Sequence, residues 1–268
     1  MMNAEMIDLH AHILPGLDDG PQDWETAVEM CRIAGRDGIR KLTATPHVKE
    51  GVYSSTPAVI ADAVAELNRR IAGVVDLQVM TGGDVHFSSD LVTRIKAGEI
   101  PMINGKNYLL LELPVNSIPM SFRQTIFELR LAGVHPILTH PERNTAFQGK
   151  EDRLREFVEG GAYVQISAMS LMGRFGSPAL KSAEALLRAG LCHNIATDAH
   201  STTTRPPILS TAAARAAEIA GERVARMLVA DVPAAIIEGR TVDVSDLAPA
   251  KRRRFPFGFG SRADTPRP

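Results

Sequence analysis

The stretch Met6-Ile7-Asp8-Leu9-His10-Ala11-His12 combines an apolar, strand-like run with an aspartate and two histidines at alternate positions. Side chains two residues apart lie on one face of a β-strand, so Asp8, His10 and His12 are predicted to point together. Two imidazoles at this spacing can bind one divalent ion, while Asp8 can orient one of the rings. Such pairs also occur by chance, so the interpretation depends on the rest of the chain.

Five further polar clusters also end apolar, strand-like runs. In chain order they are Asp18-Asp19-Gly20, Thr45-Pro46-His47, Gly83-Asp84, Glu112-Leu113-Pro114 with Thr139-His140-Pro141-Glu142-Arg143, and Asp198-Ala199-His200. A barrel of parallel strands brings the carboxyl ends of its strands onto one face. The recurrence of imidazole and carboxylate groups at these ends therefore predicts a single metal-binding face.

Strand-like and helical stretches alternate along most of the chain. The β-rich runs are Met6–His10, Ile39–Thr45, Leu77–Thr81, Tyr108–Leu113, Val134–Thr139, Ala162–Ile166 and His193–Thr197. Helical spacing occurs at Trp24–Gly35, Ala58–Ala72, Ser121–Ala132, Asp152–Glu159 and Pro178–Ala189. This alternation predicts an α/β fold with a parallel sheet, and seven strands favour a closed or nearly closed barrel. No Gly-x-Gly-x-x-Gly follows a strand, which argues against dinucleotide binding.

The C-terminal part of the chain consists of predicted helices followed by a tail of different composition. Helices are predicted at Leu209–Gly221, Glu222–Ala230 and Val232–Gly239, and they complete one domain over residues 1–245. Residues 246–268 contain the basic run Lys251-Arg252-Arg253-Arg254 followed by aromatic, glycine and proline residues. This composition predicts a disordered tail. Such a cluster could contact anionic lipid or an acidic partner, but we favour a solvated tail.

Composition excludes several classes of protein. The 268 residues carry a formal net charge of −1, so they lack the basic face that nucleic acid binding demands. No run approaches the ~20 apolar residues of a membrane span, and no secretory signal opens the chain. Two cysteines are too few for a disulfide framework, so a cytoplasmic location is expected. A cysteine-dependent phosphatase needs arginine six residues after its cysteine, whereas Asp37 and Asp198 follow Cys31 and Cys192 at that distance.

The polar clusters together resemble one enzyme family. The opening stretch MIDLHAHILPGLDDGP at residues 6–21 is similar to that of the bacterial PHP-superfamily (polymerase and histidinol phosphatase) tyrosine phosphatases of capsule and exopolysaccharide loci. The likeness extends, in order, from residue 6 to 240 through Ala44-Thr45-Pro46-His47, Leu111-Glu112-Leu113-Pro114, His140-Pro141-Glu142-Arg143, and Thr197-Asp198-Ala199-His200 with Arg205-Pro206-Pro207. The resemblance implies a PHP-type distorted (β/α)7 TIM-like barrel.

The resemblance also implies two or three divalent ions, with manganese preferred. Imidazole and carboxylate ligands admit iron, zinc or cobalt as well. The first ion would be bound by His10, His12, Glu112 and Asp198; the second by Glu112, Asp84 and either His47 or His140; the remaining one by Asp19, His200 and either His140 or His47. Glu is expected in the family at position 84, so the shorter Asp84 makes occupancy of its ion an open question.

Charge and chemistry fit the hydrolysis of a phosphate monoester. Four carboxylates and three divalent ions would leave a net charge of plus two, which suits a phosphate dianion. Arg143 and Arg205 are expected to bind its nonbridging oxygens as bidentate hydrogen-bond donors. Water activated by the divalent ions is the expected nucleophile. Either water or His86 could protonate the leaving oxygen.

The resemblance implies a phosphotyrosine protein as substrate, specifically a bacterial tyrosine autokinase that controls polysaccharide export, and a possible homo-oligomer. Three alternatives remain at this point. A small-molecule phosphatase such as histidinol phosphatase, or a phosphodiesterase, could use the same ions. A metal-binding regulatory subunit without catalysis is a third, although the intact set of ligands argues against it.

Overall fold

The computed structural model describes residues 5–242, 244 and 247. Apart from Leu247, the predicted tail at 246–268 lies outside the described residues. Two sheets occupy the centre, one with the strand order β1-β2-β5 and the other β10-β9-β8-β7-β6-β3-β4. The strands are β1 (Met6–Ala11), β2 (Ile39–Ala44), β3 (His47–Lys49), β4 (Tyr53–Ser54), β5 (Gln78–Thr81), β6 (Asp84–His86), β7 (Tyr108–Glu112), β8 (His135–Thr139), β9 (Tyr163–Ser167) and β10 (Asn194–Ala196).

The two sheets join into one ring. Strands β2 and β3 are interrupted at Thr45-Pro46, and β5 and β6 at Gly82-Gly83, yet the parallel register continues across both breaks. At the second break, a Cβ on Gly83 would lie 2.4 Å from Cγ of Pro101, so this close approach requires glycine. A parallel bridge between Ala11 and Ala199 brings β1 to the segment after β10. Seven strand positions thus close a barrel, and the predicted (β/α)7 architecture is confirmed.

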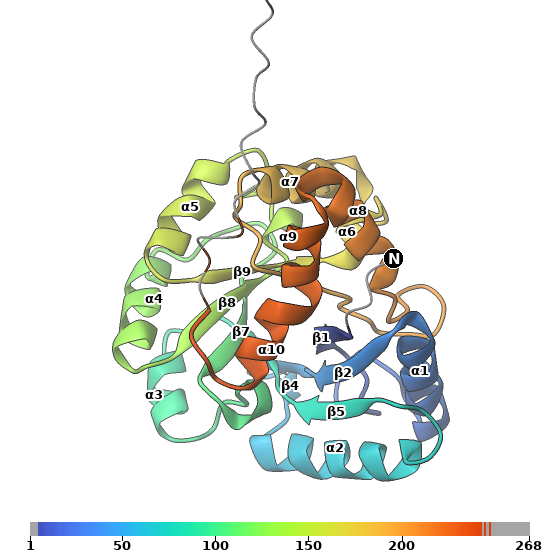
Figure 1. Cartoon of the computed structure of the whole chain (residues 1–268). Helices are drawn as coiled ribbons and strands as arrows, with labels where there is room; N and C mark the ends of the chain where they lie inside the picture. The colour runs from blue at the N-terminus through green and yellow to red at the C-terminus, as the bar shows by residue number, and fades with distance from the viewer. Residues whose placement is uncertain (1–4, 243, 245–246, 248–268) are drawn as a thin grey trace, which may run out of the picture.

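Helices surround the strands, as Figure 1 shows. They are α1 (Trp24–Asp37), α2 (Pro57–Ile71), α3 (Leu91–Lys96), α4 (Phe122–Leu131), α5 (Glu151–Glu159), α6 (Ala168–Leu171), α7 (Gly176–Arg188), α8 (Ser210–Ala220), α9 (Glu222–Arg226) and α10 (Val232–Ile237). A π-helical turn, Met227–Asp231, joins α9 to α10, where the sequence predicted two separate helices. None of the described helices is long and apolar enough to cross a membrane.

The last helix lies against the amino-terminal side of β7. The Tyr108 hydroxyl, at the start of β7, donates to the Arg240 carbonyl at 2.8 Å. The Asn104 side chain, just before that strand, donates to the Ile237 carbonyl at 2.9 Å. The C-terminal helix thus covers the strand's beginning and leaves its carboxyl end, at Glu112, on the other side.

Candidate metal centre

All nine residues predicted as ligands converge at the carboxyl ends of the strands. Each has an imidazole nitrogen or carboxylate oxygen within 4 Å of another member of the set, which comprises His10, His12, Asp19, His47, Asp84, Glu112, His140, Asp198 and His200. They come from seven separate stretches of the chain. The arrangement follows from the parallel barrel, because successive strands deliver their last residues to the same face.

His10, His12 and Asp198 form the most deeply buried group. The Nε2 atoms of the two imidazoles are 3.0 Å apart, and they lie 3.6 and 3.5 Å from Oδ1 of Asp198. All three residues are almost completely buried. The group is held by the closure of the barrel, since the Asp198 amide donates to the His10 carbonyl at 2.8 Å.

Two residues outside the predicted set orient these imidazoles. Gln165 Oε1 lies 2.6 Å from His10 Nδ1, and Asp18 Oδ2 lies 2.6 Å from His12 Nδ1. Contacts of this kind fix the orientation of a ring and leave Nε2 available to a metal. Asp18 stands in the predicted Asp18-Asp19-Gly20 cluster, whereas Gln165 is a buried polar residue in β9 that the sequence analysis did not select.

Asp8 does not orient a ring, contrary to the sequence-based expectation. Its carboxylate accepts hydrogen bonds from the Thr197 amide at 3.0 Å and hydroxyl at 2.5 Å, and from the His10 amide at 3.3 Å. It therefore ties β1 to the end of β10. The alternation along β1 places Asp8 inside the barrel, but too deep to reach either imidazole.

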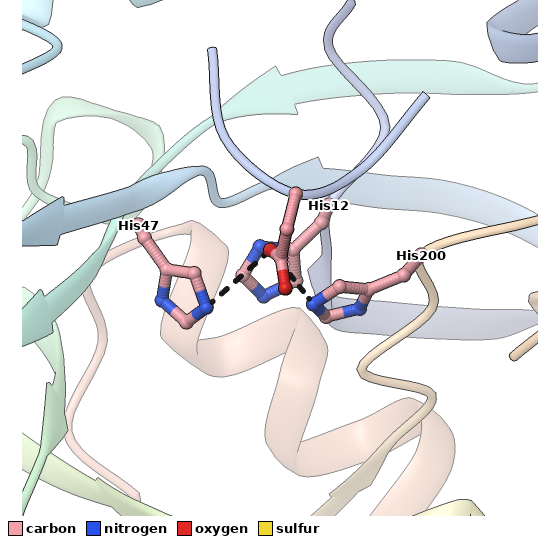
Figure 2. Close-up of side chains that lie close together, drawn as sticks. His12, His47 and His200 are labelled. Carbon is pink, nitrogen blue, oxygen red and sulfur yellow. Dashed lines mark ion pairs between the residues drawn. The ribbon is translucent and has the colours of Figure 1, made fainter. Parts of the chain in front are cut away.

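The groups around His47 and His140 differ in composition. Donor atoms of Asp84, Glu112 and His140 all lie within 4.8 Å of one another, and so do those of His12, Asp19, His47 and His200. His47 Nε2 lies 3.7 Å from Asp19, and His140 Nε2 lies 3.7 Å from Glu112. Figure 2 shows the rings of His12, His47 and His200 beside one another. His140 therefore groups with Asp84 and Glu112. His47 faces both sides, because its Nδ1 lies 3.2 Å from Asp84 Oδ2 and 3.5 Å from Glu112 Oε2 while its Nε2 points to Asp19.

Two of these residues have a backbone that L-amino acids rarely adopt. His140 has φ of 36° and Asp198 has φ of 52°, both in the left-handed region. Such conformations cost on the order of 1–3 kcal/mol and persist where the surrounding structure holds them, often at functional sites. His140 directly follows β8 and Asp198 lies two residues after β10, so both unusual conformations occur at the carboxyl ends of strands, where the candidate ligands gather.

The chemistry of the donors fits divalent cations. His47 Nδ1, Asp84 Oδ2 and Glu112 Oε2 are buried without hydrogen-bond partners among the described residues, although both oxygens lie within 3.5 Å of that nitrogen. Burial lowers the pKa of His10 to about 4, despite the pull of Asp84 and Asp198. Burial also opposes a charge on His12, yet Asp18 and Asp198 raise its pKa to about 10. The buried carboxylates thus stabilise a positive charge in the centre, and bound divalent cations would supply that charge.

Arg143 and Arg205 both reach Asp198. Arg143 Nη1 and Arg205 Nη2 lie 2.7 and 2.5 Å from the same oxygen, Oδ2. Both guanidinium groups also stack over the ring of Phe175, at 4.3 and 5.7 Å from its centroid. Phe175 lies between α6 and α7, and no sequence signal marked it because it adjoins neither arginine in the chain. The two arginines form a cationic rim beside the imidazoles.

The cysteines lie elsewhere. Cys31 and Cys192 are free and buried, and burial raises the pKa of Cys31 to about 12. A thiol with such a pKa is a poor nucleophile near neutral pH. The exclusion of cysteine-dependent catalysis, drawn from spacing, therefore agrees with the burial of both thiols.

The Asp18→Asn variant tests the orientation of His12. Asp18 Oδ2 faces His12 Nδ1 and accepts from the His47 amide, while Oδ1 accepts from the Gly20 amide. An amide at this position removes the charge beside His12 and mismatches at least the contact with Gly20. We expect divalent metal affinity to fall about 10–100-fold, as for loss of other outer-shell partners. Competition with a chromophoric chelator would measure it, with exposed Asp62→Asn as the matched control. Unchanged affinity would show that Asp18 does not position the ring.

Known proteins with similar sequences share this fold. Residues 6–238 match the family described as "Capsular polysaccharide synthesis, CpsB/CapC". The tyrosine-protein phosphatase YwqE of Bacillus subtilis (strain 168) is 34% identical over 255 residues, covering 95% of this chain and 100% of that protein. The putative tyrosine-protein phosphatase CapC of Staphylococcus aureus is 38% identical over 205 residues, covering 76% and 80%.

Two solved structures are similar to this chain in fold. A chain from the crystal structures of YwqE from Bacillus subtilis and CpsB from Streptococcus pneumoniae, described as metal-dependent tyrosine phosphatases, matches with a TM-score of 0.86 and 33% identity, covering 92% of this chain and 100% of that one. The lactonase Lmo2620 from Listeria monocytogenes matches with a TM-score of 0.57 at 11% identity, covering 89% and 96%. The second likeness shows the barrel fold alone.

Proposed function

The chain belongs to the capsular polysaccharide synthesis CpsB/CapC family, and we propose that its metal centre hydrolyses phosphotyrosine in proteins. The enzyme is a metal-dependent phosphoric monoester hydrolase. The observation that carries the proposal is the placement of two guanidinium groups on Asp198, beside imidazole and carboxylate ligand groups from seven stretches of the chain. Cationic donors next to a candidate metal centre suit a phosphate ester.

Nine residues would hold the ions: His10, His12, Asp19, His47, Asp84, Glu112, His140, Asp198 and His200. Divalent ions, when bound there, activate water and neutralise the charge that develops on phosphoryl oxygens. Manganese is the proposed metal, and iron, zinc or cobalt would suit the same ligands. Asp19, Asp84, Glu112 and Asp198 supply four negative charges, so three divalent ions would leave plus two for a phosphate dianion.

Arg143 and Arg205 would bind the phosphate. Each guanidinium carries five donors in a planar fork, and together they can hold two nonbridging oxygens. Their attachment to Asp198 and their stacking over Phe175 limit the directions in which the two groups can point. Orientation in advance of binding reduces the cost of aligning the ester for in-line attack.

The lining of a cavity beside the centre supports the proposal that the leaving group is aromatic. It is lined by polar residues such as His140 and Arg143 and by the apolar side chains of Leu113, Val115 and Phe147. A tyrosine ring esterified to phosphate has the same combination of an apolar body and an anionic end. Phenolate is also a good leaving group, with a pKa near ~10 in model peptides.

The proposed substrate is the phosphotyrosine-bearing segment of a bacterial tyrosine autokinase that controls capsule or exopolysaccharide synthesis. Relatives named for capsule genes, CapC and CpsB, support that context. The alternatives that use the same ions are a histidinol-phosphatase-like monoesterase and a phosphodiesterase.

Substrate comparison with the metal-loaded enzyme tests the proposal. A phosphotyrosine peptide, a phosphoserine peptide, histidinol phosphate and bis(p-nitrophenyl) phosphate would be supplied in parallel, each with and without a chelator. We expect chelator-sensitive release of phosphate from the phosphotyrosine peptide, with a higher kcat/KM than for the other three. Preferential hydrolysis of histidinol phosphate or of the diester would contradict the proposed substrate class and favour the corresponding alternative.

A further inference from the structure

A sixth histidine of the barrel face, His86, lies outside the nine residues discussed so far. It shares a face of β6 with Asp84, two residues earlier, and it pairs in parallel register with Glu112 of β7. Its Nε2 atom is 2.5 Å from Oε2 of Glu112. The His86 side chain is 22% exposed and that of Glu112 is 12% exposed, so the contact lies near the opening of the centre.

Glu112 Oε2 has no hydrogen-bond donor among the described residues, despite this short contact. The same oxygen lies 3.5 Å from Nδ1 of His47, which is also buried without a partner. Donor atoms of His47, His86 and Glu112 all lie within 4.8 Å of one another. Two imidazoles and a carboxylate that converge in this way, with Glu112 Oε2 and His47 Nδ1 left without a hydrogen bond, could together bind a cation.

Asp84 offers one oxygen to a cation at this position. Its Oδ1 atom accepts from the Thr139 hydroxyl at 3.4 Å, so Oδ2 remains as its unpartnered oxygen. That oxygen lies 3.2 Å from His47 Nδ1. The side chain is fully buried, at the inner end of the pair that it forms with His86 along β6. A cation beside His47 Nδ1 would thus also be near one oxygen of Asp84 and one of Glu112.

We propose that His86 is a further metal ligand, which binds one ion together with His47 and Glu112. The inference rests on the proposed metal centre and goes beyond its nine residues. An additional imidazole ligand makes this position richer in nitrogen, and nitrogen ligands favour Zn²⁺, Co²⁺ or Fe²⁺ over Mg²⁺ and Mn²⁺. The competing role for His86 is that of a hydrogen-bond donor that only positions Glu112.

Co²⁺ binding separates the two roles without using catalysis. The metal-stripped full chain and its His86→Ala, His86→Gln and His135→Ala variants would be titrated with Co²⁺, recording ions bound per chain and the visible absorption spectrum. Gln retains a hydrogen-bond donor for Glu112 but is a poor ligand for cobalt. His135 lies outside the centre, where it stacks on Tyr108, and controls for the loss of one imidazole.

In both His86 variants we expect the affinity of one site for Co²⁺ to fall by more than the ~10–100-fold that is typical of losing an outer-shell partner. The absorption bands of the Co²⁺ at that site should also change. The other ions and the His135→Ala variant should bind as in the wild type. Millimolar imidazole should restore the lost ion to His86→Ala. Unaltered circular dichroism would show that each variant is folded.

Two other outcomes would overturn the inference. Wild-type affinity and spectrum in His86→Gln would show that His86 only positions Glu112. Equal Co²⁺ binding in all variants would show that His86 is not a metal ligand, and the proposed phosphatase function would still stand. Failure of the wild-type chain to bind Co²⁺ would instead contradict the metal centre itself, and with it the proposed function.

Discussion

Replacement of Glu112 by Gln is expected to remove metal from the centre and to abolish hydrolysis of phosphotyrosine. Glu112 faces His140 through Oε1 and both His47 and His86 through Oε2, so it is placed to serve two ions. The amide keeps the shape of the side chain but removes its charge and one acceptor oxygen. The loss of kcat/KM should exceed the ~10–100-fold that follows removal of an outer-shell partner.

Metal analysis of the purified variant, alongside turnover of a phosphotyrosine peptide, would measure the effect. The exposed Glu128→Gln on α4 is the matched control, and it should retain both metal and activity. Full activity of Glu112→Gln would remove this residue from the centre. Normal metal content with lost activity would instead assign Glu112 a role toward the substrate.

Arg143→Ala and Arg205→Ala are each expected to lower kcat/KM by about 10²–10³-fold, the range found when a donor to a developing oxyanion is removed. Metal content should stay near that of the wild type, because neither guanidinium is a possible metal ligand. Lys at either position should restore little, since it lacks the planar fork that stacks over Phe175.

Steady-state kinetics with a phosphotyrosine peptide, together with metal analysis, would test these variants. The exposed Arg153→Ala serves as the control. Wild-type kcat/KM in both variants would exclude the arginines from phosphate binding. Loss of metal in proportion to activity would mean that they act by holding Asp198, which both contact.

Much of the barrel could be predicted because its signals are local. The apolar run of β1, the alternation of strands with helices, and polar residues at strand ends all lie within a few positions of one another. The short elements escaped prediction for the same reason: β3, β4 and β6 have only two or three residues, too few to show a period. The π-helical turn Met227–Asp231 carries no local signal: the predicted helix Glu222–Ala230 includes its first four residues, and the predicted boundary between helices falls at Asp231.

The arrangement of the centre depends on contacts between distant segments, which the sequence does not display. His47 and His140 both adjoin a proline at a strand end, so their local patterns could not assign them to different groups. The strand register shows where each lies: His47 pairs with Asp84 of β6, whereas His140 follows β8, which lies beside β7 and its last residue Glu112. His86 faces Glu112 because β6 and β7 pair in one particular register. Gln165 reaches His10 across the inside of the barrel, 155 residues away in the chain.

The most direct test of the account is phosphate release from a phosphotyrosine peptide by the full chain, measured together with its metal content before chelation, after chelation and after return of Mn²⁺. We expect two or three divalent ions per chain, loss of turnover when they are removed, and recovery when Mn²⁺ is restored. Turnover that persists in the metal-free protein, or a metal-loaded protein that leaves phosphotyrosine intact, would contradict it.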